Sequence, residues 1–366
     1  MQRRDFIRFS LLSIAAFSSA HALAGNSLEL PDLRFLSSVD NTLGEHFIVA
    51  ANSAGRELFR IPVAERCHSG CLHPNASQTV IMSRRPGKNL YVINMLNGTL
   101  DALVEAGDGF HFYGHGVFSQ DGSRFYATAN HYPSGAGQIR VYAVDDGYRH
   151  LQDLPVGGMD PHELRLHPDG QRLVVALGGI KTHPDYGRIK LNLESMQPAL
   201  IVMDRDSGEV LQRCEPSHHQ LSCHHLDISR DGIVIAGYQF EGAKWQTPPL
   251  IARLDTRTGE FSEIAFPEQE QASLGNYTAS VAINPNSSIA AITAPRGDHV
   301  MLLDYRSGQP MGLVSVPDPG GVLAERDGGF VVSSGHGGLY RIQASGAEPE
   351  LITHHALRWD NHLTRA

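Results

Sequence analysis

Short segments in which apolar and polar residues alternate recur along the chain, and each ends at a turn rich in glycine, aspartate or asparagine. A typical copy reads I-R-V-Y-A-V-D-D-G. The copies begin at Glu57, Leu90, Ile139, Leu200, Ile251, Val300 and Leu339. Alternation with a period of two residues indicates half-buried β-strands. Seven copies spaced by roughly 40–50 residues predict a seven-bladed β-propeller, in which each blade is a small sheet of short strands.

Composition favours one all-β domain over residues 25–366. The chain has 366 residues with 37 Gly and 20 Pro, and no segment shows a sustained apolar stripe at helical spacing. The segment W-D-N-H-L-T from Trp359 has the features of a lone inner strand, whereas the first copy of the repeat, at Glu57, lacks one. We therefore expect the C-terminal strand to join the N-terminal blade, which would pair exposed strand edges and close the ring.

Residues 1–24 have the features of an export signal. Arg3 and Arg4 precede D-F-I, an apolar run covers residues 11–17, and H-A-L-A ends at Ala24. This order resembles a twin-arginine signal peptide, so we expect a mature protein in the periplasm. Later apolar runs are shorter than the ~20 residues of a membrane-spanning helix, and we expect a soluble monomer. The formal net charge of -9, without a basic tract, argues against nucleic acid as a partner.

Five histidines stand at or near the start of predicted inner strands, each shortly before a turn or the chain end. They are His68, His115, His162, His225 and His362. If the blades form one ring, these imidazoles point at one another across its axis. Imidazole is the commonest metal ligand and suits iron, copper, zinc and nickel. The pattern predicts a metal site at the axial mouth.

A structural role for the same histidines is the alternative. A histidine at the start of an inner strand can serve only to pack and to form hydrogen bonds within the fold. Repeats descended from one ancestral blade also share residues by inheritance, so the recurrence of histidine does not require a common function. Two predicted blades lack the histidine and carry Tyr277 or Asp318 near that place. His224 fits one register of the pattern as well as His225 fits the other. We therefore do not expect a fully symmetric cage.

The connections between the second and third strands should lie on the same face as the histidines, because the chain returns to that face at the end of each second strand. They are long and polar, and such loops on a rigid scaffold commonly build sites. With Tyr277 nearby, the candidate ligand-binding residues are Arg84, Arg85, His183, Asp185, Arg188, Lys190, Tyr277 and Arg296. A locally basic mouth would attract an anionic ligand. Ordinary pairing of these arginines with carboxylates such as Glu194 or Asp298 is the alternative.

The four cysteines would face an oxidising compartment, where pairing is permitted. Cys214 and Cys223 bracket a short connection and could form a local disulfide. Cys67 and Cys71 lie on one short strand at a spacing that directs their side chains apart. Cys67 and Cys223 each stand beside a candidate histidine and remain open as further ligands.

Several motifs together resemble the domain of unknown function 1513 family. They are R-R-D-F-I, S-R-R-P-G, G-H-G-V-F-S-Q-D-G, P-H-E-L, N-Y-T-A-S, the long block from Gly178 to Leu200, and the terminal W-D-N-H-L. The resemblance covers essentially the whole mature chain. It implies an exported protein encoded beside imelysin-type periplasmic proteins and a dihaem-peroxidase-like protein, and hence a role in iron acquisition with these proteins as partners. One departure is Cys67-His68-Ser69, where Gly-His-Gly is common in the family.

Three functions remain open at this stage. The first is a binding protein that captures iron, copper or an anionic metal complex at the histidine-rich mouth, accessory to iron acquisition. The second is a metal-dependent enzyme, oxidase-like or lactonase-like, in which His183, Asp185 or Tyr277 moves protons. The third is a metal-free scaffold that docks a partner protein. No phosphate loop, Ser-His-Asp set or H-E-x-x-H helix occurs, so we expect no nucleotide cofactor and no hydrolysis by those routes.

Overall fold

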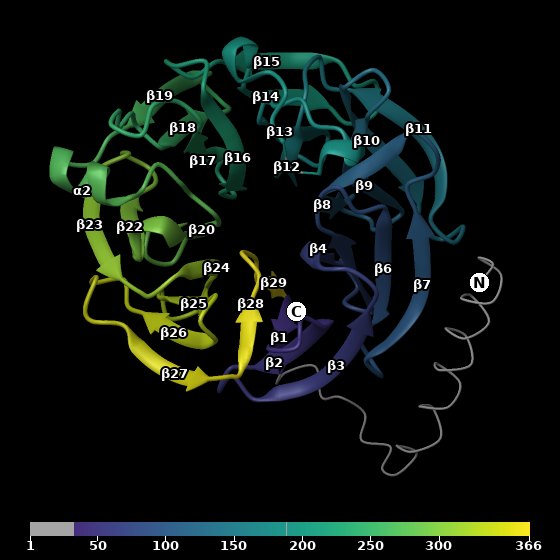
Figure 1. The fold of residues 1–366 in the computed structure, drawn as a ribbon, viewed down its shortest axis with the longest axis horizontal. Coiled ribbons are helices and arrows are strands. Elements are labelled where there is room, and N and C mark those ends of the chain that lie inside the picture. The colour runs from purple at the N-terminus through teal and green to yellow at the C-terminus, as the bar shows by residue number, and fades with distance from the viewer. Residues whose placement is uncertain (1–32, 188) are drawn as a thin grey trace.

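Seven antiparallel sheets stand around a central axis in the computed structural model, which describes residues 33–187 and 189–366 (Figure 1). Blade 1 holds the N-terminal strands, and blades 2 to 7 follow in chain order. Blade 1 contains β1 (Leu33–Asn41), β2 (His46–Asn52), β3 (Glu57–Val63), β28 (Leu357–Trp359) and β29 (Thr364–Arg365). Blade 2 contains β4 (Cys67–Leu72), β5 (Gln78–Ser83), β6 (Asn89–Asn94) and β7 (Thr99–Glu105). This architecture confirms the predicted seven-bladed propeller.

The remaining blades each have four strands in chain order from the axis outward. Blade 3 contains β8 (Phe110–Phe118), β9 (Arg124–His131), β10 (Ala136–Ala143) and β11 (Arg149–Pro155), and blade 4 contains β12 (Pro161–Leu166), β13 (Arg172–Leu177), β14 (Ala199–Asp204) and β15 (Val210–Cys214). Blade 5 contains β16 (Leu221–Ile228), β17 (Ile233–Phe240), β18 (Ile251–Asp255) and β19 (Glu260–Ile264). Blade 6 contains β20 (Val281–Asn284), β21 (Ile289–Ala294), β22 (His299–Asp304) and β23 (Pro310–Ser315), and blade 7 contains β24 (Pro319–Ala324), β25 (Phe330–Ser334), β26 (Gly338–Ile342) and β27 (Glu350–His354).

The ring closes through its C-terminus, as the sequence predicted. β28 and β29 both pair with β1, with Val39 opposite Trp359 and Phe35 opposite Arg365, so they form an interrupted inner strand for blade 1. The β1 strand precedes the N-terminal segments that the repeat pattern identified, which become the third and fourth strands of the blade. The closing segment also passes very close to β24 of blade 7. A Cβ atom on Gly321 would lie 2.5 Å from the backbone nitrogen of Leu363, so this position needs glycine.

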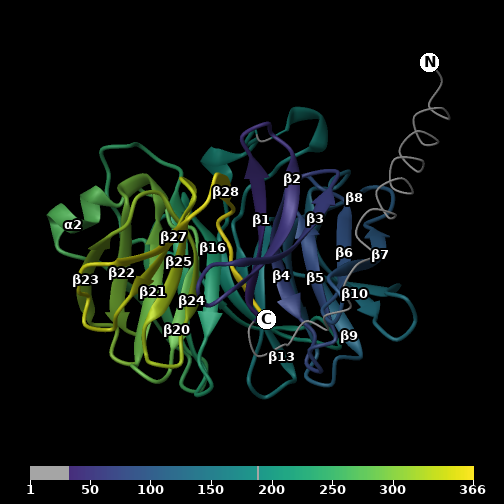
Figure 2. The same cartoon turned by 90° about the horizontal axis from the view of Figure 1, so that it is seen from below.

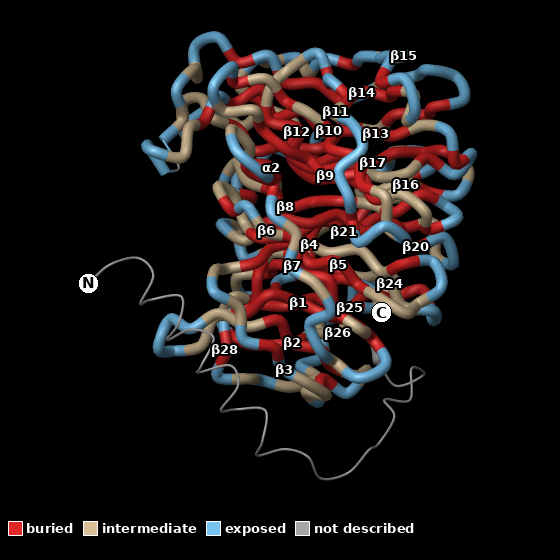
Figure 3. The backbone as a smooth tube through the Cα atoms, turned by 90° about the vertical axis from the view of Figure 1, so that its right-hand side faces the viewer, coloured by how far each residue is buried: buried red, intermediate tan, exposed pale blue. Residues whose placement is uncertain are grey.

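The hydrophobic core lies between adjacent blades, whose sheets pack face to face. Val141 of blade 3 packs in one cluster with Leu173 of blade 4, and Val331 of blade 7 packs in another with Trp359 of the closing strand. The alternating apolar positions of the middle strands supply these buried side chains. Figure 3 shows burial concentrated in the strands and exposure in the connections. The connections gather at the two faces of the ring, as the side view in Figure 2 shows.

The helical elements are short and lie in connections. They are η2 (Pro184–Tyr186) and η3 (Leu193–Ser195) in the long blade 4 connection, α2 (Glu268–Ser273) before blade 6, and η4 (Pro295–Gly297) within blade 6. Within the described residues, no helix is long and apolar enough to cross a membrane. The four cysteines are free thiols, so Cys214 and Cys223 do not pair. The expected signal peptide, residues 1–24, and Arg188 lie outside the described residues.

Candidate metal centre

The inner strands are interrupted at the places where the candidate histidines stand. In blades 2 to 5 the strand register shifts at Cys67/Gly70, Phe112/Gly116, Pro161/Glu163 and Cys223/His225. In blade 1, His362 lies in the gap between β28 and β29. A β-bulge leaves one residue out of the pairing ladder and redirects its side chain. These irregularities therefore explain how strands that run along the channel direct imidazoles into it.

The five predicted histidines converge at the axis. The ring centroid of His362 lies 4.4 Å from that of His68, 4.7 Å from His115 and 4.6 Å from His225. His162 completes the group at 5.0 Å from His225 and 5.7 Å from His115. All five are buried, with exposed fractions between 1% and 8%. We call these five residues the central cluster.

A sixth histidine adjoins the central cluster. The ring of His224 stacks on His162, with centroids 3.9 Å apart and an angle of 17° between the ring planes. It is 4% exposed, and it precedes His225 on the same inner strand. Two consecutive residues can both face the channel here because the register shifts between Cys223 and His225.

Carboxylates face four rings of the central cluster, and the longest of these contacts is that of Nδ1 of His115 with Oε1 of Glu163, at 3.7 Å. Nδ1 of His68 lies 2.6 Å from Oδ1 of Asp360, and Nδ1 of His225 lies 3.0 Å from Oε2 of Glu163. Nδ1 of His162 lies 3.4 Å from Oδ1 of Asp160. Since an ionised carboxylate only accepts hydrogen bonds, the facing Nδ1 donates, and a neutral ring then keeps its lone pair on Nε2. Metal-binding histidines are oriented by carboxylates in the same way.

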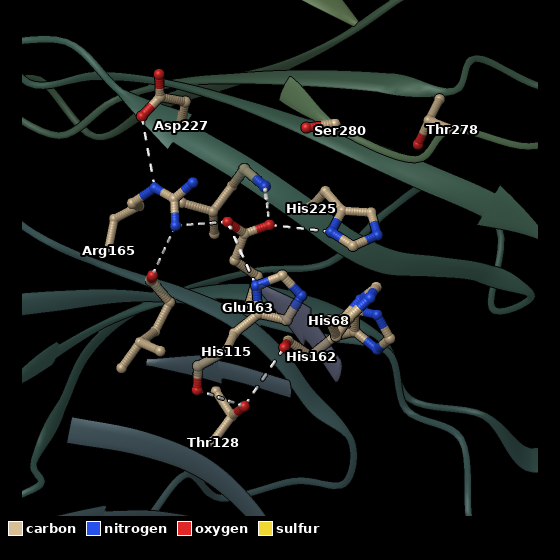
Figure 4. Close-up of polar contacts among 12 residues, drawn as sticks. His68, His115, Thr128, His162, Glu163, Arg165, His225, Asp227, Thr278 and Ser280 are labelled. Carbon is tan, nitrogen blue, oxygen red and sulfur yellow. Dashed lines mark hydrogen bonds and ion pairs between the residues drawn. The ribbon is translucent and has the colours of Figure 1, made fainter. Parts of the chain in front are cut away.

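The carboxylates are themselves held by arginines. Oδ2 of Asp360 forms ion pairs with Nη2 of Arg66 and Nη1 of Arg84, each at 2.9 Å. Glu163 lies 2.5 Å from Nη1 of Arg165, whose Nε continues to Asp227 at 3.5 Å. Figure 4 shows Glu163 between His225 and Arg165 in this chain of contacts. Five of these six charged side chains come from inner strands or the residues next to them, and Arg84 follows a second strand. Charged groups therefore surround the central cluster.

The electrostatics favour the neutral form of four imidazoles of the central cluster and the charged form of two carboxylates. The imidazoles are those of His68, His115, His162 and His362, and the carboxylates are those of Asp360 and Glu163. Burial lowers the pKa of His68 to about 3 and that of His162 to about 4. Burial also holds the pKa values of His115 and His362 well below the usual 6.5, and the neighbouring imidazoles add to the shift. Burial would raise the pKa of Asp360, but Arg84, His68 and Arg66 together outweigh it and hold that pKa well below its usual range. Neutral imidazole is the form that binds a metal ion.

Several ring nitrogens have no hydrogen-bond partner among the described residues. The buried atoms without such a partner are both ring nitrogens of His115, both ring nitrogens of His224, and Nε2 of His362. A buried polar atom without a partner costs about 1–3 kcal/mol, so native proteins rarely leave several together. A metal ion or a bound molecule would satisfy such atoms. A purely structural role for the histidines would instead require each ring to be hydrogen-bonded.

Among residues 33–187 and 189–366, three groups of side chains could hold a metal ion. Two lie within the central cluster: His68 with His115 and His362, and His115 with His162 and His225. In each group the ligand atoms lie within 4.8 Å of one another. Metal–imidazole bonds of about 2.1 Å place ligands of one ion within about 4.2 Å, so small side-chain rotations suffice. His115 belongs to both groups and is the residue on which they depend.

The central cluster divides the channel into two pockets. One, of about 250 Å³, contains five of the predicted ligand-binding residues, Arg84, Arg85, Lys190, Tyr277 and Arg296, together with Tyr113 and Gln239. We call it the mouth pocket. The other, of about 340 Å³, is lined by Arg165, Asp227 and residues from the later parts of the inner strands. His362 borders this second pocket, whereas His68, His162 and His225 border the mouth pocket.

The mouth residues differ in how their charge is used. Arg84 pairs with Asp360, Arg85 lies 3.7 Å from Asp160, and Lys190 pairs with Glu241. Arg296 instead stands over the ring of Tyr277, with 4.3 Å between its guanidinium carbon and the ring centroid. Hence part of the predicted basic character is neutralised by carboxylates, as the alternative interpretation held, while Arg296 keeps its charge beside the pocket.

Two predicted residues lie elsewhere. His183 caps η2 by accepting a hydrogen bond from the backbone N–H of Asp185, and Asp185 is largely exposed. Neither lines the mouth pocket. The cysteines considered as further ligands belong to none of the three metal-holding groups. Burial raises the pKa of both Cys67 and Cys223, which disfavours the thiolate that a metal would need.

Sequence reasoning missed most of the carboxylates. Asp160 and Glu163 were not identified, and His224 was noted only as an alternative to His225. A signal was available, because Asp160 and Asp360 each stand two residues before a histidine of the cluster. The two pairings still differ: Asp160 faces His162, whereas Asp360 faces the histidine of another blade.

Comparison with known proteins supports the fold and a family but no activity. A family model described as "Protein of unknown function (DUF1513)" matches residues 61–366. Among solved structures, a chain of Kuenenia stuttgartiensis Hydrazine Synthase is similar, with a TM-score of 0.63 and 13% sequence identity over 92% of this chain and 99% of that chain. At this identity the likeness concerns the fold alone. No curated protein sequence matches.

Proposed function

The chain belongs to the DUF1513 family of proteins of unknown function, and from that premise and the channel geometry we propose that it binds a transition-metal ion at the central cluster. The ligands are imidazoles of His68, His115, His162, His225 and His362. Iron is the first candidate and copper the second, because both accept nitrogen-rich sites. The metal or its small anionic complex enters from the mouth pocket.

One observation carries this proposal: buried, neutral imidazoles crowd together with ring nitrogens that no described residue satisfies. Crowding of five imidazoles within 4.4–6.4 Å has little value for packing, since apolar side chains would fill the same space without unsatisfied atoms. The carboxylates on Nδ1 of His68 and His225 also fit metal ligation, because they orient each ring and raise its basicity.

The mouth pocket suits an anionic metal complex as well as a bare ion. Arg296 lies beside Tyr277 at the edge of the mouth pocket. Arg85 also lines the pocket, and its buried Nη1 has no hydrogen-bond partner among the described residues. Guanidinium groups bind carboxylate and oxyanion ligands through paired hydrogen bonds. A chelate would therefore present its metal to the imidazoles and its anionic groups to the arginines.

We extend the proposal to the periplasm and to iron acquisition. The twin-arginine pattern supports export, and the family resemblance supports work beside imelysin-type and dihaem-peroxidase-like proteins. In this role the propeller holds the metal and passes it to such a partner.

Metal content of purified mature protein tests the proposal. Protein is incubated anaerobically with Fe²⁺, or separately with Cu²⁺ or Zn²⁺, desalted, and analysed by mass spectrometry for bound metal. The test variant is His115→Ala with His362→Ala, and the control is His131→Ala with His150→Ala, which changes two histidines outside the central cluster. We expect retention of metal by the wild type and the control and a loss of at least tenfold in affinity in the test variant. Equal metal content in all three would overturn the proposal.

A metal-dependent enzyme is the second candidate function. It is favoured by the pocket of about 250 Å³ beside a cluster whose three-ligand groups leave coordination positions open. Tyr277 and Tyr113 border that space. Loaded protein would then consume dioxygen or peroxide, or open a lactone, at a rate above that of the free metal. Binding without turnover would leave the binding protein as the function.

A further inference from the structure

A third group of potential ligands stands beside the central cluster. Asp160, His162 and His224 place ligand atoms within 4.8 Å of one another. Their exposed fractions are 0%, 8% and 4%. The first two come from the start of blade 4 and the third from blade 5. The group therefore lies at the boundary between two blades.

Two of these side chains have buried polar atoms without partners. Both ring nitrogens of His224 and Oδ2 of Asp160 have no hydrogen-bond partner among the described residues. The face of the His224 ring packs against His162. This stacking does not give the two ring nitrogens a hydrogen-bond partner. Leaving all three atoms unsatisfied would cost about 1–3 kcal/mol each.

The local backbone makes room for the Asp160 carboxylate. Asp160 adopts a left-handed conformation with φ of 56°, and its carbonyl accepts a hydrogen bond of 2.7 Å from the backbone N–H of Gly178. A Cβ atom at Gly178 would lie 2.2 Å from Oδ2 of Asp160. Hence glycine at this position leaves the space that the free oxygen occupies.

We propose that Asp160, His162 and His224 form a second metal position next to the central cluster. Two imidazoles and one carboxylate on one side of an ion leave the other side open, which is the ligand pattern of non-haem iron(II) sites. A carboxylate oxygen is a harder ligand, in the sense of hard and soft Lewis bases, than the imidazole nitrogens of the central cluster. The second position therefore favours Fe²⁺ over the softer Cu⁺. With both positions filled, the central ion is held by His68, His115 and His362, which leaves the one lone pair of a neutral His162 for the second position. The inference rests on the proposed function, because the second position adjoins the central cluster in the same channel.

The open side of the second position faces the mouth pocket. His162 and His224 both line that pocket, together with Arg85 and Tyr113. Nη1 of Arg85 lies 3.7 Å from Oδ1 of Asp160. The guanidinium carbon of Arg85 also lies 5.9 Å from the ring centroid of Tyr113. An exogenous ligand of the metal would therefore meet a positive charge, which favours a small anion such as a carboxylate.

Stoichiometry of Fe²⁺ binding under anaerobic conditions tests the second position. We expect two equivalents in the wild type, one in His224→Ala, one in Asp160→Asn, and one in the central-cluster variant His115→Ala with His362→Ala. The matched control is His219→Ala, from the other stacked histidine pair, His218 and His219, whose ring centroids are 4.9 Å apart. The control should keep two equivalents. Circular dichroism verifies that each variant is folded. If His224→Ala does not fold, Asp160→Asn provides the test of the second position.

The outcomes separate this inference from the proposed function. One equivalent in the wild type, unchanged in His224→Ala and lost in the central-cluster variant, would overturn the second position and leave the central site standing. Two equivalents in both Asp160→Asn and His224→Ala would overturn it as well. Absence of iron from the wild type would overturn the second position and iron as the metal of the central cluster, and absence of copper and zinc as well would overturn the proposed function. Nitric oxide added to the Fe²⁺ protein gives a further readout: we expect a spin-3/2 paramagnetic signal whose intensity per protein falls in His224→Ala and stays unchanged in the His219→Ala control.

Discussion

His68 and Asp360 stand 292 positions apart in the chain, yet Nδ1 of His68 lies 2.6 Å from Oδ1 of Asp360. Asp360 follows directly on the strand that closes the ring. The contact that orients one imidazole of the central cluster is therefore made only when the two ends of the chain have joined. Ring closure and assembly of the central cluster are one structural event.

Asp360→Asn should weaken metal binding while keeping the ring closed. The amide is of the same size and can still accept a hydrogen bond from His68, but it no longer supplies the negative charge that makes the imidazole a better ligand. Loss of such an outer carboxylate typically lowers metal affinity about 10–100-fold. Calorimetric titration with Zn²⁺ or Fe²⁺ measures the change. Asp185→Asn, on an exposed side chain, is the control and should leave affinity unchanged.

The two tryptophans of the chain allow a matched test of closure. Trp359 is 2% exposed, packs edge-on against Phe35 and donates a hydrogen bond to the carbonyl of Gly337. Trp245 is 85% exposed. Trp359→Ala should lower the free energy of unfolding by about 3–5 kcal/mol, and Trp245→Ala by about 0.5 kcal/mol or less. Urea denaturation followed by circular dichroism compares them, and equal losses would contradict a stabilising role for the closing strand.

The propeller could be predicted because its signals are local and repeated. Each copy of the alternating pattern marks one strand, so the number of blades follows from the number of copies. The lone strand at Trp359 and the incomplete first copy at Glu57 together predicted closure. Convergence of the histidines followed from their common place on inner strands, since equivalent positions in a ring face the same axis.

The partners of the histidines could not be predicted in the same way, because they depend on contacts between blades. Glu163 stands next to His162 in sequence but orients His225 of the following blade. The left-handed backbone of Asp160 and the register shifts in the inner strands are also set by tertiary contacts. His183 was expected at the mouth from the length of its loop, whereas a local hydrogen bond to Asp185 holds it as a cap.

Thr128 supports the central cluster from the second strand of blade 3. Its hydroxyl lies 3.1 Å from the carbonyl oxygen of His115 and 3.5 Å from that of His162, and it joins the two bulges (Figure 4). Thr128→Val preserves shape and removes this bridge, so we expect a lower free energy of unfolding, by about 1–3 kcal/mol, and weaker metal binding. Thr256→Val removes an equivalent bond of 2.8 Å to the carbonyl oxygen of Gly232, and the imidazole that Thr256 contacts, His167, is not part of the cluster. It should destabilise similarly without changing metal affinity.

Acid should destabilise the metal-free protein well above the pH at which its carboxylates titrate. Burial lowers the pKa of His68 to about 3 and that of His162 to about 4, from the usual 6.5. In the unfolded chain these rings take up protons near pH 6.5, so between pH 6.5 and about 4 the unfolded state binds more protons than the folded one. The free energy of unfolding therefore falls as the pH falls through this window.

At pH 5 the loss is on the order of 2 kcal/mol for each such histidine, and His115 and His362 shift in the same direction. Thermal unfolding between pH 7.5 and 5 should show a steep fall in the melting temperature. His162→Gln should flatten this dependence, because one buried titrating group is removed, whereas His150→Gln on the surface should not. Since the metal binds the neutral rings of the folded state, loading should move the fall to lower pH. A melting temperature that stays constant across the range would contradict burial of neutral imidazoles in the channel.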